Sequence, residues 1–144
     1  MTLAAILDDP SQRARFVQDG VRLIESEVSS KGGLTGLALK AGFRAVQGLR
    51  PGMVAELLDM LLPHFAPALE PHVAQAVGSG DVPAWFSAHA DQLADAMLAV
   101  TDARADRAQN ALLRRTYQSL RGQARVHTVQ AMPAAGRLLA PYLT

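Results

Sequence analysis

The chain has 144 residues, the usual length of one domain, and it contains no cysteine, which excludes disulfide bonds and thiolate chemistry. The net charge of +1 indicates no partner by itself, and no apolar stretch reaches the roughly 20 residues of a membrane span. The first residues lack the basic region of a signal peptide, so we expect a cytoplasmic protein.

Alanine (26 residues) and leucine (20) far outnumber valine (11) and isoleucine (2). The first two are the strongest helix formers, which favours an all-α fold. The charge is unevenly spread, because residues 1–95 hold 7 basic and 11 acidic residues while residues 96–144 hold 7 arginines and 2 aspartates. Such a split predicts either pairing between the two parts or a basic surface on the second.

Proline and glycine divide the first half into helices. Asp9 followed by Pro10 is typical of an N-cap and a first helical position, and the helix should end within residues 29–33. A second helix is predicted from about Leu34 to Leu49, ended by Pro51-Gly52. Its basic and apolar residues would suit an anionic membrane surface, but its glycines favour close packing on another helix.

A third, apolar helix is predicted over residues 52–62. Pro63, Pro67 and Pro71 follow at four-residue spacing, and each would break or kink a helix interior, so we expect short pieces near 64–70 and 71–77. Asp81 and Pro83 should begin a short helix that carries Trp85 and Phe86.

The C-terminal third should hold the longest helix. Asp91 can cap it, and a separate short helix is expected from Pro133 to the C-terminus. The sequence therefore predicts one all-α domain over residues 1–144, an irregular bundle of five to seven helices whose long C-terminal helix can be broken.

Six arginines lie on one side of the predicted helix between Thr101 and His127. At 100° per residue they fall within an arc of roughly 120° and span about 32 Å. None has an acidic residue three or four positions before it, so partners must come from elsewhere in the chain, another subunit, a ligand or water. The six are Arg104, Arg107, Arg114, Arg115, Arg121 and Arg125.

The apolar face of this helix changes sides along its length. Leu93, Met97 and Val100 lie at about the angle of the arginines, whereas Leu112 and Leu120 lie opposite. Either the helix breaks, with Thr101 or Asn110 as N-cap, or its two halves meet different partners. A helix shared between two subunits would also explain the change, so we expect a dimer.

Three segments resemble a known family. They are residues 99–136, with the pattern VTDARA...TYxxLRG...P, residues 26–54, and LLPHFAPAL at 61–69. Together they resemble an uncharacterised bacterial family, a domain of unknown function, of short all-helical proteins. Met132 departs from that pattern, where leucine is expected. The resemblance implies a small helical cytoplasmic protein and no activity.

One polar cluster is a candidate site. Thr101, Asp102 and Arg104, with Asn110, Tyr117 and Arg121, could hold a phosphate or carboxylate, or could form an ion-pair network that ties helices together. The four histidines show no metal-ligand spacing, no serine lies in a GxSxG motif, and no cofactor motif is present. An enzyme is therefore unsupported.

The sequence favours a non-enzymatic protein that self-associates or binds a protein partner. The alternative is an anionic ligand, whether nucleic acid, lipid headgroup or phosphorylated metabolite, bound by the arginine face through Arg104, Arg107, Arg114, Arg121 and Arg125 with Thr101, Asp102 and Tyr117. The sequence supports nucleic acid and an anionic membrane less well as partners, since the isoelectric point is only about 8.3.

Overall fold

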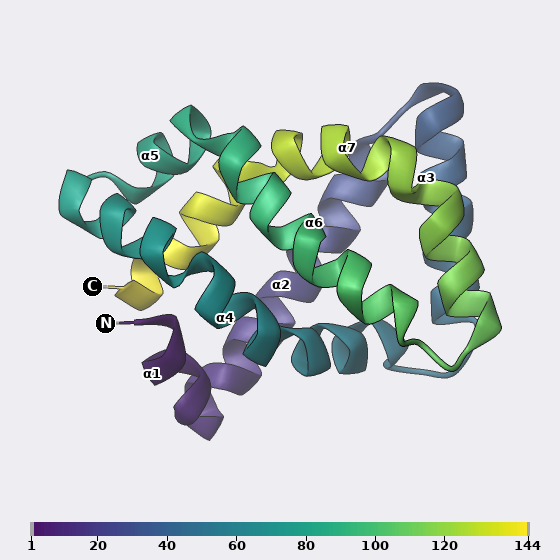
Figure 1. Cartoon of the computed structure of the whole chain (residues 1–144), viewed down its shortest axis with the longest axis horizontal. Coiled ribbons are helices and arrows are strands. Elements are labelled where there is room, and N and C mark those ends of the chain that lie inside the picture. The colour runs from purple at the N-terminus through teal and green to yellow at the C-terminus, as the bar shows by residue number, and fades with distance from the viewer. Residues whose placement is uncertain (1, 144) are drawn as a thin grey trace.

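The computed structural model describes residues 2–143, with the backbone alone for Thr35, and shows an all-α protein (Figure 1). Its described part forms seven helices and no strand. They are α1 (Leu3–Asp8), α2 (Pro10–Ser30), α3 (Gly33–Gln47), α4 (Met53–Ser79), α5 (Val82–Ala88), α6 (Ala90–Asp106) and α7 (Ala111–Leu143). The predicted fold class is confirmed.

Local capping explains where several helices begin. The Asp9 carboxylate accepts hydrogen bonds from the backbone N–H groups of Ser11 and Gln12, and Pro10 occupies the first position of α2. Asp81 caps α5 in the same way by accepting from Ala84 N. Asp91, in contrast, caps nothing, because it lies inside the first turn of α6 and His89 is the N-cap residue.

The prediction that α4 breaks at its prolines is wrong, since the helix continues through Pro63, Pro67 and Pro71. At four-residue spacing the three rings lie along one exposed line of the helix, where water can reach the carbonyl groups that lose their donors. The carbonyl that Pro63 would leave free belongs to Asp59, and Arg13 Nη2 of α2 donates to it at 3.0 Å. A distant side chain thus replaces the missing N–H.

The prediction of a separate helix from Pro133 is also wrong, because α7 runs without a break from Ala111 to Leu143. Buried residues on both sides of the proline hold it against α5. The two helices approach so closely that a Cβ atom on Gly136 would lie 2.9 Å from Pro83 Cα. Tertiary packing therefore outweighs the one lost backbone hydrogen bond.

The chain does break between α6 and α7. Asn110 caps α7 by accepting from the backbone N–H groups of Leu112 and Leu113, so the break falls at one of the two sites that the sequence offered. The six arginines consequently belong to two helices and to the turn between them, because the break that the sequence left open separates Arg104 from the four arginines of α7. The hairpin explains the change of apolar face within one chain, so self-association stays a prediction without that support.

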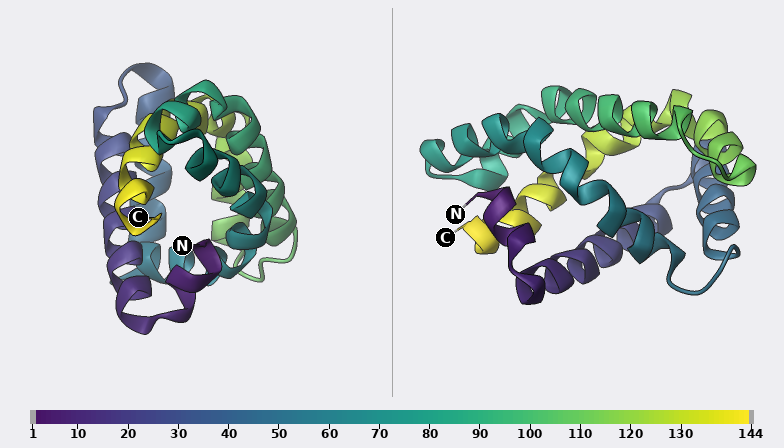
Figure 2. Two further views of the ribbon diagram at one scale, coloured as in Figure 1. Left: turned by 90° about the vertical axis from the view of Figure 1, so that its left-hand side faces the viewer. Right: turned by 60° about the horizontal axis from the view of Figure 1, so that its bottom comes forward.

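The buried core lies at one end of the molecule, near both termini (Figures 1 and 2). It is built by α1, α5, the second halves of α4 and α7, and the start of α6. Its members are Leu3, Ile6, Ala66, Val73, Ala76, Phe86, Leu93, Met132, Leu139 and Leu143. None of the described helices combines the length and apolar content needed to cross a bilayer.

Candidate functional site

A pocket of about 640 Å³ opens at the opposite end of the molecule, between α2, α3, α4, α6 and α7. Sites for small molecules typically have volumes of about 300–1,000 Å³. The first half of α4, the end of α6 and the first half of α7 line it, so each of these helices contributes one part to the core and another part to the pocket.

The walls supplied by α2 and α3 are apolar. They carry no ionisable group, and α4 extends them with more aliphatic and thioether side chains. These residues are Ile24, Val28, Leu39, Gly42, Phe43, Val46, Met53, Leu57, Met60 and Leu61. At Gly42 the backbone of α3 approaches α7 closely, since a Cβ there would lie 2.6 Å from Leu120 Cδ1.

The wall at the α6–α7 turn is polar and basic. Arg104 and Arg107 line the pocket there, and neither makes a side-chain hydrogen bond or ion pair with any residue in 2–143. Arg114 also lines it and donates from Nη1 to the carbonyl of Ala108 at 2.7 Å, which fixes its guanidinium against the turn. Arg50 completes the set of four arginines, and Glu56, the one acidic lining residue, is paired with Arg50 at 2.7 Å.

Thr101 and Tyr117 line this pocket and also belong to a hydrogen-bond network on the hairpin. The Tyr117 hydroxyl donates to Asp102 Oδ1 at 2.6 Å, and Thr101 Oγ1 lies 2.6 Å from the same hydroxyl. The single proton of the Thr101 hydroxyl can also go to the Leu98 carbonyl, which lies 3.1 Å from Oγ1, so Thr101 links Tyr117 to the backbone of α6. Burial, and then the hydrogen bond to Asp102, raises the pKa of Tyr117.

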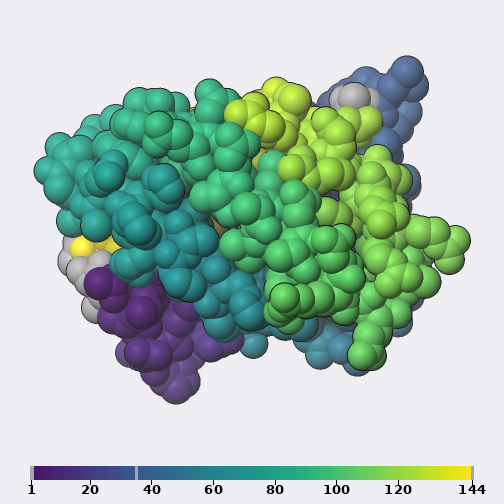
Figure 3. Space-filling view, viewed as in Figure 1, coloured from purple at the N-terminus to yellow at the C-terminus, as the bar shows by residue number. Residues whose placement is uncertain are grey.

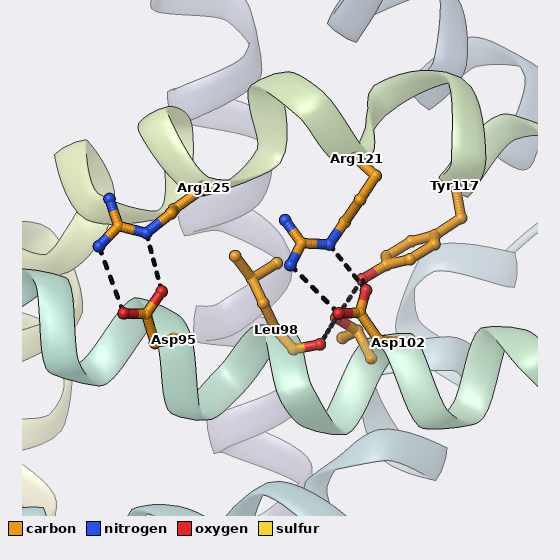
Figure 4. A network of polar contacts seen from close by, with 7 residues as sticks. Asp95, Leu98, Asp102, Tyr117, Arg121 and Arg125 are labelled. Atoms are coloured by element: carbon orange, nitrogen blue, oxygen red, sulfur yellow. Dashed lines mark hydrogen bonds and ion pairs between the residues drawn. The ribbon is translucent and has the colours of Figure 1, made fainter.

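Arg121 and Arg125 are paired across the hairpin with aspartates of α6. Arg121 donates hydrogen bonds from Nε and Nη2 to the two carboxylate oxygens of Asp102 at 2.7 and 3.1 Å (Figure 4). Arg125 donates to Asp95 in the same bidentate manner at 2.8 and 3.3 Å. The hydrogen bond from Arg121, and then that from Tyr117, lowers the pKa of Asp102, and Arg125 lowers the pKa of Asp95. Asp91 adds a longer contact to Arg125 at 3.4 Å.

The eight residues singled out in the sequence therefore divide into two groups. Five line the pocket, namely Thr101, Arg104, Arg107, Arg114 and Tyr117. Asp102, Arg121 and Arg125 instead tie α6 to α7. Arg115 is exposed and lines no pocket, so the arginines form no continuous face.

The apolar walls and Arg50 were not predicted from the sequence. Each apolar wall residue belongs to an ordinary helical stripe, and only the packing of five helices leaves these stripes facing an open volume. One available signal was the second predicted helix, whose polar residues Lys40, Arg44 and Gln47 form only one narrow stripe.

A second, smaller pocket of about 440 Å³ lies between α2 and the end of α7. Its lining mixes Arg15, Arg22 and Arg137 with Asp19 and Glu27, so its charges select no particular ligand. No three histidine, cysteine, aspartate or glutamate side chains in the described part of the chain gather closely enough to hold a metal ion.

The family model described as "Family of unknown function (DUF6918)" matches residues 3–143. The chain belongs to this family. The resemblance seen in the sequence is thereby confirmed at the level of a family of unknown function. No curated protein and no solved structure matches this DUF6918 member.

Proposed function

We propose that this protein binds a small amphipathic anion, an aliphatic chain with a carboxylate or phosphate head, in the pocket at its α3 end. The supporting observation is the asymmetry of the lining: α2 and α3 contribute only apolar side chains, and the α6–α7 turn contributes Arg104, Arg107 and Arg114. An apolar tail gains by leaving water along the first wall. A charged head gains from guanidinium groups that no carboxylate among residues 2–143 occupies.

The same lining favours binding over catalysis. Its ionisable side chains are the four arginines, one glutamate already paired with Arg50, and Tyr117, whose proton is held by Asp102. General acid–base work needs a group that gains or loses a proton near neutral pH, and arginine does not. The proposal is therefore a non-enzymatic carrier or sensor of such a ligand.

The placement of the arginines also favours a small ligand over nucleic acid. Binding a phosphate backbone depends on many free cations along one surface. Here Arg121 and Arg125 are engaged by aspartates, and three of the other four face an apolar pocket.

The direct test is isothermal titration with dodecanoate, below its micelle concentration, and with dodecanol, which has the same chain without the charge. We expect one site that prefers the carboxylate. Hydrogen bonds to charged groups contribute about 1.5–3 kcal/mol each, so the double variant Arg104→Gln/Arg107→Gln should bind dodecanoate at least about tenfold more weakly.

Arg115→Gln is the matched control, because Arg115 is exposed on α7 outside the pocket and its loss should leave the affinity unchanged. The proposal is wrong if neither compound binds. The assignment of the head group to the α6–α7 turn is wrong if both compounds bind equally or if the double variant binds dodecanoate as wild type does.

A further inference from the structure

The outer face of α3 is apolar and uncovered. Leu34 is 85% exposed and Leu37 63% exposed, the two most exposed large apolar residues in the described chain. Ala38 and Ala41 follow on the same face and are exposed as well. The start of α3 projects beyond the rest of the molecule (Figure 3). Solvent-exposed leucines that share one helix face commonly mark a contact surface.

All the charged side chains in the sequence around this face are basic. No aspartate or glutamate occurs from Val28 to Ala55, while Lys31, Lys40, Arg44 and Arg50 lie in that stretch. Glu27 and Glu56 pair with the first and last of these cations. Lys40 and Arg44 lie one turn apart on α3, and neither has an ion-pair partner among residues 2–143.

We propose that α3 docks this protein on an anionic bilayer surface. Leu34 and Leu37 enter the region between head groups and acyl chains, and Lys40 and Arg44 meet the anionic head groups, as interfacial helices generally do. A second copy of the chain fits less well. In a two-fold symmetric contact the same face meets itself, so the free cations of both copies would oppose each other across the interface.

The opposite side of α3 carries Leu39, Phe43 and Val46 into the pocket. One helix is therefore the wall between the ligand site and the docking face, so an amphipathic ligand could pass between bilayer and pocket beside it. Docking does not require that the pocket be filled, since Leu34, Leu37 and Arg44 lie outside its lining.

The test is co-sedimentation of the full chain with vesicles of phosphatidylcholine alone and with vesicles that also contain phosphatidylglycerol. We expect binding to the anionic vesicles that weakens as salt is added. The variant Leu34→Ser/Leu37→Ser should lower the partition constant about tenfold or more, and Lys40→Gln/Arg44→Gln should lower it by a similar factor at low salt.

Two controls match these variants. Val77→Ser removes an apolar side chain that is 43% exposed near the end of α4, and Arg22→Gln removes an exposed cation of α2; both should bind as wild type does. Sedimentation velocity without lipid completes the test. The proposal is overturned if anionic vesicles do not bind the chain, if the leucine variant binds them undiminished, or if that variant merely converts a wild-type dimer to monomers. The dodecanoate titration is independent of all three outcomes.

Discussion

Three helices, α4, α6 and α7, run through both ends of this molecule: at one end they help to seal a core, and at the other they line an open pocket. At the end near the termini, α1, α5 and parts of α4, α6 and α7 bury Ile6, Val73 and Leu93 almost completely. At the other end α4, α6 and α7 meet α2 and α3 around a pocket of about 640 Å³, and α3 buries no large side chain. We infer that the core end supplies most of the stability and the pocket end supplies the binding function.

The largest contrast is expected from leucine truncation at the two ends. Leu93→Ala should lower the free energy of unfolding by about 2–5 kcal/mol, because it leaves a cavity in a sealed core. Leu57→Ala enlarges a pocket that is already open, so it should cost only about 1 kcal/mol. Urea unfolding of both variants measures this, and equal losses would contradict the division into two ends.

A second contrast uses one glycine from each end. At Gly136 an added Cβ meets the backbone of Pro83 at 2.9 Å, so Gly136→Ala should destabilise the protein by about 1–3 kcal/mol. At Gly42 the added Cβ meets the end of the Leu120 side chain, which can turn toward the pocket, and lies 3.2 Å from Thr116 Cγ2. Because alanine favours a helix by about 1 kcal/mol over glycine, Gly42→Ala should be neutral or stabilising in thermal unfolding.

A smaller loss of stability is expected at acidic pH, where the aspartates that pair α6 with α7 become protonated. Asp95 and Asp102 have pKa values lowered below 3.8 in the folded state. Their contribution to stability is therefore complete above about pH 4 and is lost as the pH falls through the lowered values. The Asp102 side chain is 43% exposed and solvent screens its ion pair, so Asp102→Asn should cost no more than about 1 kcal/mol at neutral pH.

Urea midpoints recorded from about pH 6 downward test this. Asp102→Asn should show a shallower loss of stability on acidification than wild type. A variant with the same acid dependence as wild type would show that the ion pair does not hold the hairpin.

The last contrast appears only in alkaline solution and compares the two tyrosines. Tyr142, at the core end, packs edge-on against Phe16 and donates to Asp19; burial and that carboxylate raise its pKa to about 12. The pKa of Tyr117 is raised as well. The stability that Tyr142 contributes is present below about pH 10 and is lost as the pH rises toward 12.

Tyrosinate absorbance should therefore stay low at about pH 10 in the folded protein and reach roughly half of its maximum in denaturant. Tyr142→Phe should remove the rise in absorbance toward pH 12 that Tyr142 causes and leave the rise caused by Tyr117. Full ionisation of both tyrosines at about pH 10 in the folded chain would contradict the buried contacts of Tyr142.

Local chemistry made much of the fold predictable from the sequence. Asp9, Asp81 and Asn110 begin helices where their side chains can accept backbone N–H groups, and these rules act within three residues. The predictions that the helices would break at their prolines were wrong because the contacts that replace the lost hydrogen bonds come from distant parts of the chain. Arg13 reaches the carbonyl of Asp59 from 46 residues away, and α5 supports α7 around Pro133.

The site was less predictable for the same reason. The spacing of the arginines was visible, but whether each one meets an aspartate or a pocket depends on the register of the α6–α7 hairpin. Arg121 reaches Asp102 across 19 residues, whereas Arg104 faces the pocket. The apolar walls require the packing of α2, α3 and α4, which no stretch of sequence contains.

The most direct test of the central claim fills the pocket without touching a charge. Ala105 lines the pocket, and its neighbour Ala103 on α6 is exposed to solvent. Calorimetric titration of dodecanoate into Ala105→Phe and Ala103→Phe should show binding lost in the first variant and kept in the second. If Ala105→Phe binds dodecanoate as tightly as wild type does, the ligand lies elsewhere and the pocket end is not the binding site.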